Sequence, residues 1–284
     1  MTDANRKTLK SVLESAILYL QECGIEDAAR DAWLLMEYVS GMNHSTYYAN
    51  SSDEMDRGQY QRFRELLEKR GSHIPLQYLT GEAWFYGLCF HVNEHVLIPR
   101  QDTEVLVEEA LSHLSGGERI LDLCTGSGCI LTAILHETPG CTGTGADISP
   151  EALEIAAENA AELGERAQFV KSDLFRDVEG SYDLIVSNPP YIRTQVIEEL
   201  MPEVKDHEPR IALDGKEDGL YFYRRIISDA RGYLKEGGYL CVEIGYDQGQ
   251  EVRELMEQSG YTDLVVRRDL SGLDRVVSGR KGPV

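Results

Sequence analysis

Residues 119–131 read Arg119-Ile120-Leu121-Asp122-Leu123-Cys124-Thr125-Gly126-Ser127-Gly128-Cys129-Ile130-Leu131. The first five residues predict a strand, Gly126 and Gly128 predict a turn, and the apolar residues that follow predict the start of a helix. Glycine in such a turn lets the backbone approach a ligand closely. The third glycine of the dinucleotide fingerprint is missing, so the loop indicates a nucleotide-type ligand, and a Rossmann dehydrogenase is the poorer interpretation.

Two further predicted strands end in acidic residues. The second strand, residues 143–149, carries Asp147 at its end, where an acid is placed to hold two ribose hydroxyls. The third, residues 167–175, carries Asp173, which can accept a hydrogen bond from an adenine amine while Leu174 or Phe175 packs on the base. With the first loop, these strand ends predict an adenosyl site made of Cys124, Thr125, Gly126, Ser127, Gly128, Asp147, Asp173 and Leu174.

The fourth predicted strand, residues 182–187, is followed by Asn188-Pro189-Pro190-Tyr191. The prolines stiffen the backbone and hold the preceding residues extended. A fixed carboxamide, exposed carbonyls and an aromatic ring form a grip for a planar –NH2 group, so all four residues are predicted to bind substrate. Asn188, Pro189 and Tyr191 are the predicted catalytic residues, and Asn188 is also assigned to the cofactor site. An adenosyl ligand beside this grip predicts S-adenosylmethionine and N-methylation, with no metal.

The chain resembles the HemK/PrmC family, the protein-(glutamine-N5) methyltransferases that modify peptide chain release factors. Motifs from residue 70 to residue 276 carry the resemblance: Pro75–Gly81, Trp84–Gly87, Val96–Glu104, Ser187–Ile192, Glu208–Arg210, Asp218–Leu220, Glu243–Gly245 and Asp269–Arg275. The sequence departs from the family at two positions. Cys124 stands where such loops commonly have their first glycine, and Gln101 stands where a proline is expected.

The resemblance implies methylation of the side-chain amide nitrogen of the glutamine in the Gly-Gly-Gln motif of class-1 release factors. It also implies a class I, Rossmann-like α/β methyltransferase domain of seven strands, with a small helical domain that recognises the protein substrate. We predict three regions: a helical domain at residues 1–72, a β-hairpin connector at 73–103 and the catalytic domain at 104–284.

Local patterns refine these regions. The stretch from Asn5 to Gly71 is helical in pattern, with stops at Gly24 and Gly41, a third helix capped by Asp53, and a loop holding His44, Tyr47 and Tyr48. The connector predicts a hairpin that turns near Asn93-Glu94. Glu243 ends an apolar strand, and both a buried structural acid and a site residue fit that pattern.

The composition limits which kinds of binding partner and which compartment are expected. The net charge of −21 opposes binding to a phosphate backbone, which depends on Lys and Arg. This acidity fits either steering of a basic protein partner or plain solubility. The six cysteines form no CxxC pair, which fits free thiols in a reducing compartment. We expect a cytoplasmic monomer with no membrane partner.

Two alternatives come from different functional classes. A nucleic-acid methyltransferase acting on adenine N6 or guanine N2 can use the same –NH2 grip, and the acidic balance and the motifs of residues 75–104 argue against it. A binding protein that uses the fold as an adaptor is the other. The intact Asn188–Tyr191 segment and Asp147 argue against an adaptor, and a cofactor-binding test separates the two.

Overall fold

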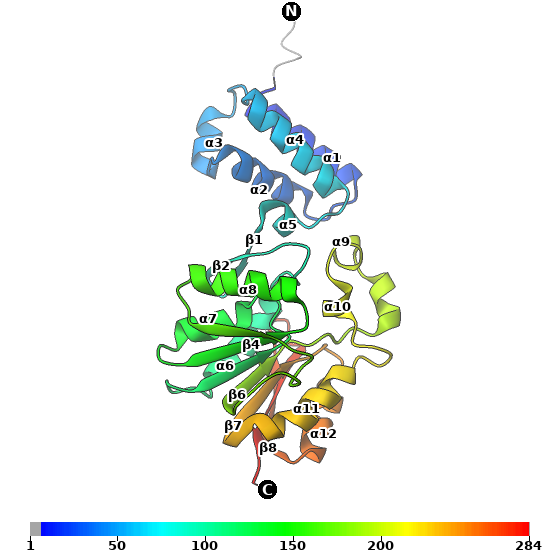
Figure 1. Cartoon of the computed structure of the whole chain (residues 1–284). Coiled ribbons are helices and arrows are strands. Elements are labelled where there is room, and N and C mark those ends of the chain that lie inside the picture. Colours follow the sequence, from blue (N-terminus) through cyan, green and yellow to red (C-terminus); the bar gives the residue numbers. More distant parts are fainter. Residues whose placement is uncertain (1–6, 284) are drawn as a thin grey trace, which may run out of the picture. The chain divides into compact units, whose positions relative to one another are not determined.

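The protein is described by a computed structural model for residues 7–283, and these form two compact units. One unit holds residues 7–81 together with Pro202–His207, and the other holds Glu82–Met201 with residues 208–283. Figure 1 shows helices in the first unit and a sheet flanked by helices in the second. The helical unit thus extends to Gly81 rather than ending at residue 72. It also takes in a short segment from far along the chain.

The helical unit packs around one apolar core. Leu20, Leu35, Met36 and Phe63 are almost completely buried there. As predicted, Gly41 ends a helix, with the left-handed φ of 70° that glycine adopts without steric cost. The helices are α1 (Leu9–Glu22), α2 (Ala28–Ser40), α3 (His44–Asn50), α4 (Arg57–Gly71), α5 (Leu76–Thr80) and α9 (Pro202–Lys205).

Two predictions in this unit were wrong. The residues from His44 to Asn50 form a helix rather than a loop, because the Asn43 side chain caps it by accepting a hydrogen bond from the Thr46 N–H at 3.0 Å. The next helix is capped by Asp56 rather than Asp53, through hydrogen bonds from the N–H groups of residues 58 and 59.

A β-hairpin opens the second unit, but its turn lies earlier than predicted. Strands β1 (Glu82–Phe85) and β2 (Leu88–His91) pair antiparallel around Tyr86 and Gly87. Both turn residues have positive φ, 50° and 76°, as the favoured two-residue hairpin turn requires. Asn93-Glu94 therefore does not form the hairpin turn and instead follows the second strand.

The sheet of the second unit has seven strands in the order β5-β4-β3-β6-β7-β9-β8. The first five in this order are parallel, and β9 and β8 pair antiparallel at one edge. The strands are β3 (Arg119–Leu123), β4 (Thr142–Asp147), β5 (Ala167–Lys171), β6 (Tyr182–Ser187), β7 (Leu234–Glu243), β8 (Tyr261–Arg268) and β9 (Asp274–Lys281).

Helices cover both faces of this sheet, which is the doubly wound arrangement (Figure 1). Neighbouring strand residues alternate between two buried clusters, with Leu121 and Ile185 in one and Ile120 and Leu184 in the other. The helices are α6 (Glu104–Leu111), α7 (Cys129–Glu137), α8 (Pro150–Glu162), α10 (Arg210–Leu213), α11 (Tyr221–Tyr233) and α12 (Gly249–Gln258), with 3₁₀ turns η1 (Gln101–Thr103) and η2 (Thr194–Glu199).

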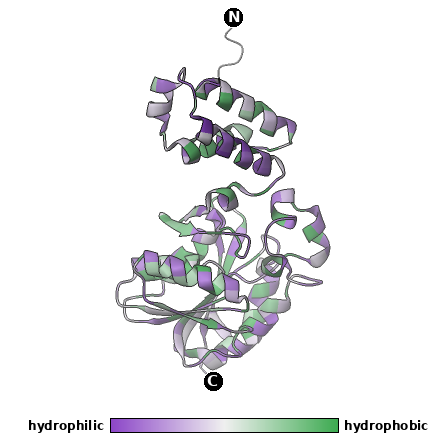
Figure 2. Cartoon of the chain, turned by 45° about the horizontal axis from the view of Figure 1, so that its top comes forward, coloured by the Kyte–Doolittle hydropathy of each residue, from purple (hydrophilic) through white to green (hydrophobic). Residues whose placement is uncertain are grey.

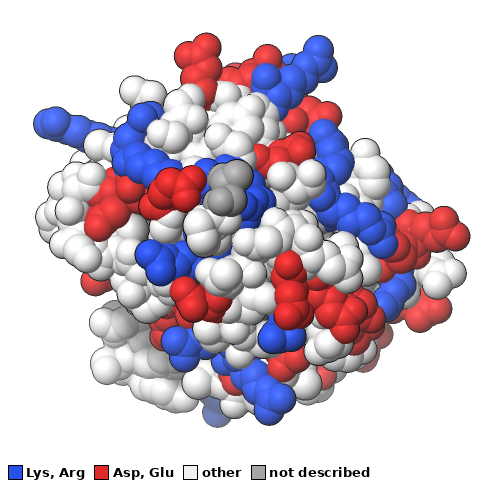
Figure 3. Space-filling view, turned by 90° about the horizontal axis from the view of Figure 1, so that it is seen from below, with Lys and Arg blue, Asp and Glu red and all other residues white. Residues whose placement is uncertain are grey.

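Polar and apolar residues are mixed along the helices (Figure 2), and charges of both signs are mixed on the one face drawn in Figure 3. Hydrophilic and hydrophobic residues lie side by side along the helices (Figure 2), as expected where one side of a helix packs on a core. On the face drawn in Figure 3, acidic and basic side chains are interspersed rather than gathered by sign. Among the described residues, no helix is long and apolar enough to cross a membrane.

Candidate active site

The candidate site lies at the carboxyl edge of the parallel strands. Strand order reverses between β3 and β6, because β4 and β5 lie on one side of β3 while β6 and β7 lie on the other. Ligands of open α/β sheets bind at such a switch point. A cavity opens there and is lined by residues that follow β3, β4, β5 and β6. Sequence positions 124, 147, 173 and 188 thus meet in one place, as predicted.

The loop after β3 has the tight backbone that its glycines indicated. Gly126 and Gly128 both have positive φ, and a side chain on Gly128 would meet the Ala156 Cβ of α8 at 3.0 Å. Cys124 also has a positive φ, 57°, which costs a non-glycine residue roughly 1–2 kcal/mol. The position where the family commonly has glycine therefore keeps a glycine-like backbone. Cys124, Thr125, Gly126 and Ser127 line the cavity, whereas Gly128 packs behind it.

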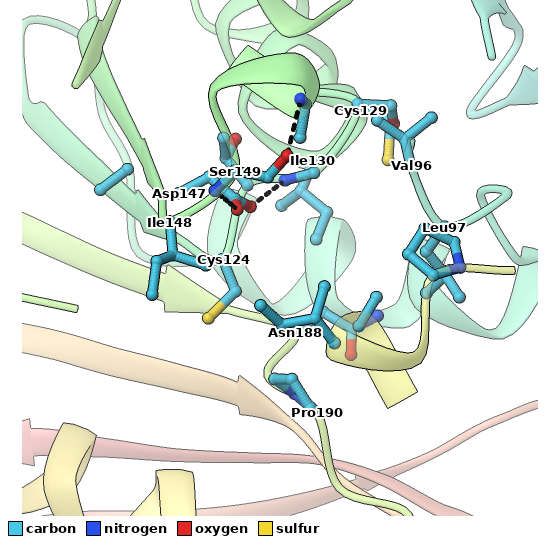
Figure 4. A pocket seen from close by; sticks show the side chains of 18 of the residues that line it. Val96, Leu97, Cys124, Cys129, Ile130, Asp147, Ile148, Ser149, Asn188 and Pro190 are labelled. Atoms are coloured by element: carbon cyan, nitrogen blue, oxygen red, sulfur yellow. Dashed lines mark hydrogen bonds between the residues drawn. The ribbon is translucent and has the colours of Figure 1, made fainter. Parts of the chain in front are cut away.

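Asp147 ties the second strand end to this loop. Its Oδ2 accepts a hydrogen bond from the Gly126 N–H at 2.9 Å, and its Oδ1 accepts one from the Ser149 N–H at 3.0 Å (Figure 4). Burial raises the pKa of Asp147, and these two backbone hydrogen bonds oppose the rise. The carboxylate lines the cavity, so its remaining lone pairs are available to ligand hydroxyls.

The third strand end supplies an apolar wall with one acid. Leu174 is buried, lines the cavity and has a positive φ of 54°. Asp173 also lines the cavity, and its Oδ1 accepts a hydrogen bond from Arg225 Nη1 at 3.0 Å. Phe175 turns away, because it stacks on Tyr233 with ring centroids 4.6 Å apart. Ile148 and Phe222 line the cavity as well, although no pattern in the sequence points to either residue.

Asn188 reaches the cavity from the end of β6. The Ser187 hydroxyl donates to the Leu123 carbonyl at 2.8 Å and so fastens this strand end to β3. The Asn188 Nδ2 donates to the Thr103 hydroxyl at 3.4 Å, and both side chains line the cavity. Figure 4 shows Asn188 and Pro190 on the wall near Cys124. The amide of Asn188 is therefore held by a residue of η1.

The other members of the tetrapeptide are placed differently. Pro190 lines the cavity, whereas Pro189 and Tyr191 do not. The Tyr191 ring packs on the apolar core, and its hydroxyl donates to Glu243 Oε1 at 3.2 Å. Its carbonyl accepts from Gln248 Nε2 at 3.1 Å, and Gly215 and Gly219 press on its backbone, where a Cβ on either would come within 2.6 Å. Tyr191 thus fixes the segment from behind.

Segments outside the four strand ends complete the wall. Val96, Leu97, Pro99 and Arg100 come from the connector, and Pro209, Ile211 and Ala212 come from the segment around α10. Backbone hydrogen bonds between Ile192 and residues 213 and 215 bring that second segment back to the tetrapeptide. Arg100 and Ile98 both donate to the buried Glu208 carboxylate and so join the two segments. Periodicity gives no signal for such loop contacts.

Comparisons with known proteins identify the family. Residues 11–81 match the PrmC N-terminal domain and residues 101–205 match the methyltransferase small domain. The protein named release factor glutamine methyltransferase in Geobacter sulfurreducens is 41% identical over 276 residues, 97% of each chain. Its namesake in Caulobacter vibrioides is 42% identical over 272 residues, 93% of each. The chain belongs to the release factor glutamine methyltransferase family.

Solved structures agree on the fold. A methyltransferase from Pyrococcus furiosus superimposes with a TM-score of 0.53 at 18% identity, covering 70% of this chain and 91% of that one. A 16S rRNA methyltransferase of T. Thermophilus, solved with AdoMet and guanosine, gives 0.51 at 17% identity, covering 71% and 50%. The second unit is therefore a class I methyltransferase domain, and the family makes the chain an enzyme that uses S-adenosylmethionine.

The residues that line the cavity are chemically suited to bind S-adenosylmethionine. Gly126 leaves room for a close ligand, because a Cβ there would meet nothing within 4 Å, and Asp147 presents a carboxylate beside it. Leu174, Ile148 and Phe222 offer apolar surface for a flat base. Asp122 lies beneath the loop, fully buried, and accepts a hydrogen bond from the Thr125 hydroxyl at 2.6 Å. Burial raises the pKa of Asp122 to about 7.

Proposed function

We propose that this enzyme methylates the side-chain amide nitrogen of the glutamine in the Gly-Gly-Gln motif of class-1 peptide chain release factors. The observation that carries the proposal is the Asn188 carboxamide, which lines the cavity at the end of β6 while Asp147 and the 124–128 loop line it at the neighbouring strand ends. An acceptor of amide hydrogens therefore stands beside a site that fits S-adenosylmethionine. The names of the full-length relatives supply the substrate.

The main task of the protein in this reaction is to align the substrate amide nitrogen with the methyl group. An amide nitrogen is a weak nucleophile because its lone pair is delocalised, whereas the bound cofactor supplies a methyl group on an activated sulfonium. The nitrogen must lie in line with the S–CH3 bond, at about 3–3.5 Å from the methyl carbon. Asn188 Oδ1, which lines the cavity, accepts one amide hydrogen. The Pro189 carbonyl accepts the other, although Pro189 is not among the residues that line the cavity, and the two contacts turn the lone pair toward the methyl group.

The same two acceptors stabilise the charge that develops during transfer. Formation of the N–CH3 bond would break the S–CH3 bond and leave its electron pair on sulfur, so positive charge would build on the substrate nitrogen. Acceptors fixed in advance around that nitrogen stabilise the transition state, as donors do in an oxyanion hole. The proton leaves the nitrogen after methyl transfer, so no strong base is required. Tyr191 contributes by holding the segment rigid rather than by entering the cavity.

The partner and setting follow from the same proposal. The protein substrate is the release factor, and the helical unit, with the connector, is the substrate-recognition part. The enzyme acts as a cytoplasmic monomer without direct nucleic-acid or membrane contact. The net charge of −21 supports a protein partner, because a phosphate backbone would be repelled. Light scattering of the enzyme alone and with release factor tests the monomer and the complex.

The decisive experiment is transfer of labelled methyl from S-adenosylmethionine to purified release factor. The control is a release factor whose motif glutamine is replaced by alanine. Label on the wild-type factor alone supports both the substrate and the site of methylation. Label on neither protein, but on added tRNA, rRNA or DNA, would overturn the proposal and assign the –NH2 grip to a base. Cofactor binding without any transfer would point to an adaptor.

A further inference from the structure

Gln248, just before α12, carries a buried carboxamide that bonds to three stretches of backbone. The residue is only 3% exposed. Its Oε1 accepts a hydrogen bond from the Gly245 N–H at 2.9 Å. Its Nε2 donates to the Tyr191 carbonyl at 3.1 Å and to the Gly219 carbonyl at 3.3 Å. One side chain therefore joins the end of β7, the Asn188–Tyr191 segment and the turn before α11.

The partners of Gln248 settle which end of its amide is which. A backbone N–H only donates and a backbone carbonyl only accepts, so Oε1 must face Gly245, and Nε2 must face Tyr191 and Gly219. The space around the amide is also tight. A Cβ on Gly219 would lie 2.6 Å from Nε2, and a Cβ on Gly245 would lie 2.9 Å from Oε1. The carboxamide is therefore held in a single orientation.

The Asn188–Tyr191 segment depends on such an outside attachment because two of its residues are prolines. Proline has no N–H and fixes φ, so the segment cannot continue the ladder of β6 but is stiff between its ends. At its beginning, the Ser187 hydroxyl donates to the Leu123 carbonyl at 2.8 Å. At its end, Gln248 holds the Tyr191 carbonyl. A stiff segment fixed at both ends leaves the carboxamide at its first position little freedom to move at the cavity wall.

We propose that Gln248 is a positioning residue for methyl transfer, which fixes the place of Asn188 without lining the cavity itself. This inference rests on the proposed function, in which Asn188 Oδ1 accepts an amide hydrogen. Through Gly219, Gln248 also holds the turn that leads to Phe222, a residue of the cavity wall. Methyl transfer needs the nitrogen and the methyl group aligned, and a misplacement of about 1 Å can cost on the order of 100-fold in rate.

The first test compares Gln248→Glu with the wild-type enzyme on release factor. Glutamate keeps the shape and still accepts from Gly245, but an oxygen replaces the donor that faces the two carbonyls. Those carbonyls lose their partner and repel the new charge, so the end of the segment must move. We expect kcat per folded molecule to fall roughly 10- to 100-fold. The Kd for S-adenosylmethionine should stay close to the wild-type value, because Asp147 and the 124–128 loop are unchanged.

Acid should partly rescue this variant. Once protonated, the introduced carboxyl has an O–H that can donate to the Tyr191 carbonyl, and burial raises the pKa of such a group. The ratio of the variant's kcat to the wild-type kcat should therefore rise as the pH falls, whereas lower folding stability would not raise it. A ratio that stays low in acid would contradict a role for this hydrogen bond. Charged and titratable groups beside position 248 include Arg193, Tyr223, Asp247 and Asp274.

Two controls place similar changes elsewhere. Gln250→Glu adds a charge to an exposed residue of α12 whose side chain donates to Glu254, and it should leave kcat unchanged. Glu109→Gln alters a buried side chain of α6 outside the cavity, and it should lower stability while kcat per folded molecule stays the same. If Gln248→Glu likewise lowers only stability, Gln248 is a structural residue and the proposal is wrong.

A second readout does not depend on turnover. The side-chain amide NMR signal of Asn188, assigned by its loss in Asn188→Ala, should move in Gln248→Glu and stay in place in both controls. A signal that moves while the wild type transfers no methyl to release factor would keep the positioning role and reject the proposed substrate. A signal that stays in place in Gln248→Glu, or a normal kcat in that variant, would overturn the positioning role.

Discussion

The Gly126 N–H and the Asp147 Oδ2 are joined by a hydrogen bond of 2.9 Å. This bond links the loop after β3 to the end of β4 across the edge where the sheet binds ligands. Because the same carboxylate faces the cavity, a ligand that bonds to Asp147 meets a group already fixed by the loop. Shape and charge of the cofactor site are thus set together rather than by separate residues.

Asp147→Ala should therefore weaken cofactor binding. Losing a hydrogen bond to a charged group costs about 1.5–3 kcal/mol, which corresponds to a weakening of roughly 10- to 100-fold. Titration calorimetry with S-adenosylmethionine measures this directly. Asp183→Ala is the control, because Asp183 lies outside the cavity and accepts hydrogen bonds from the Arg119 N–H and from Lys235. Equal affinities for the two variants would remove Asp147 from the site.

Asn188→Ala should abolish methyl transfer and largely spare cofactor binding. The substitution removes the acceptor that turns the amide lone pair toward the methyl group, while the 124–128 loop and Asp147 remain. Single-turnover transfer to release factor, measured beside calorimetry with the cofactor, separates the two effects. Asn50→Ala, at the half-buried end of α3 and away from the cavity, is the control. Near-normal turnover in Asn188→Ala would refute the mechanism.

Cys124→Gly should leave the free energy of unfolding unchanged or raise it. Glycine adopts the positive φ of this position without the cost of about 1–2 kcal/mol that a side chain brings, although its unfolded state is more flexible. Cys129→Gly, at the first turn of α7, should instead lose about 1–2 kcal/mol from poorer helix propensity and lost burial. Denaturant unfolding compares both; equal losses would contradict a backbone effect at Cys124.

The stabilising contribution of Glu109 should be lost in acid, so the enzyme should become less stable there. Burial alone would raise the pKa of Glu109, but hydrogen bonds from His113, Ser278 and Arg267 lower it to about 2. Because the folded pKa lies below the unfolded value, the stabilisation is full above about pH 4.5 and is lost as the pH falls toward 2. This lowering of the pKa corresponds to about 3 kcal/mol in the free energy of unfolding. In Glu109→Gln, urea midpoints measured from pH 6 to pH 3 should be lower and flatter than in the wild type.

The strand ends at the site could be predicted because β3 and β6 are short apolar runs, and ligand-type residues stand at or just after the ends of β3, β4, β5 and β6. Strand ends in an α/β sheet meet at one edge, so Asp147, Asp173 and Asn188 were brought together by topology alone. The positions of turns were harder to predict from the sequence. The hairpin turns at Tyr86-Gly87 because both residues take positive φ, and a tyrosine gives no such signal.

Contacts between segments that lie far apart in the chain could not be predicted from the sequence. Thr103 and Glu243 look like a helix cap and a buried strand end, and only their shared contact with the Asn188–Tyr191 segment gives them a place in the site. Ile148, Phe222 and Ile211 line the cavity from loops or helix ends, where apolar residues follow no period. The wall of the site is set by loop packing, which local patterns do not encode.

The inclusion of Pro202–His207 in the helical unit has a consequence for synthesis on the ribosome. Arg70 is buried, and it pairs with Asp31 at 2.7 Å and with Glu203 at 3.0 Å, a residue made 133 positions later. At roughly 5–20 residues per second, that delay is on the order of ten seconds. During this interval the nascent helical unit holds an incompletely paired guanidinium, so it reaches its final form only after most of the catalytic sheet has been translated.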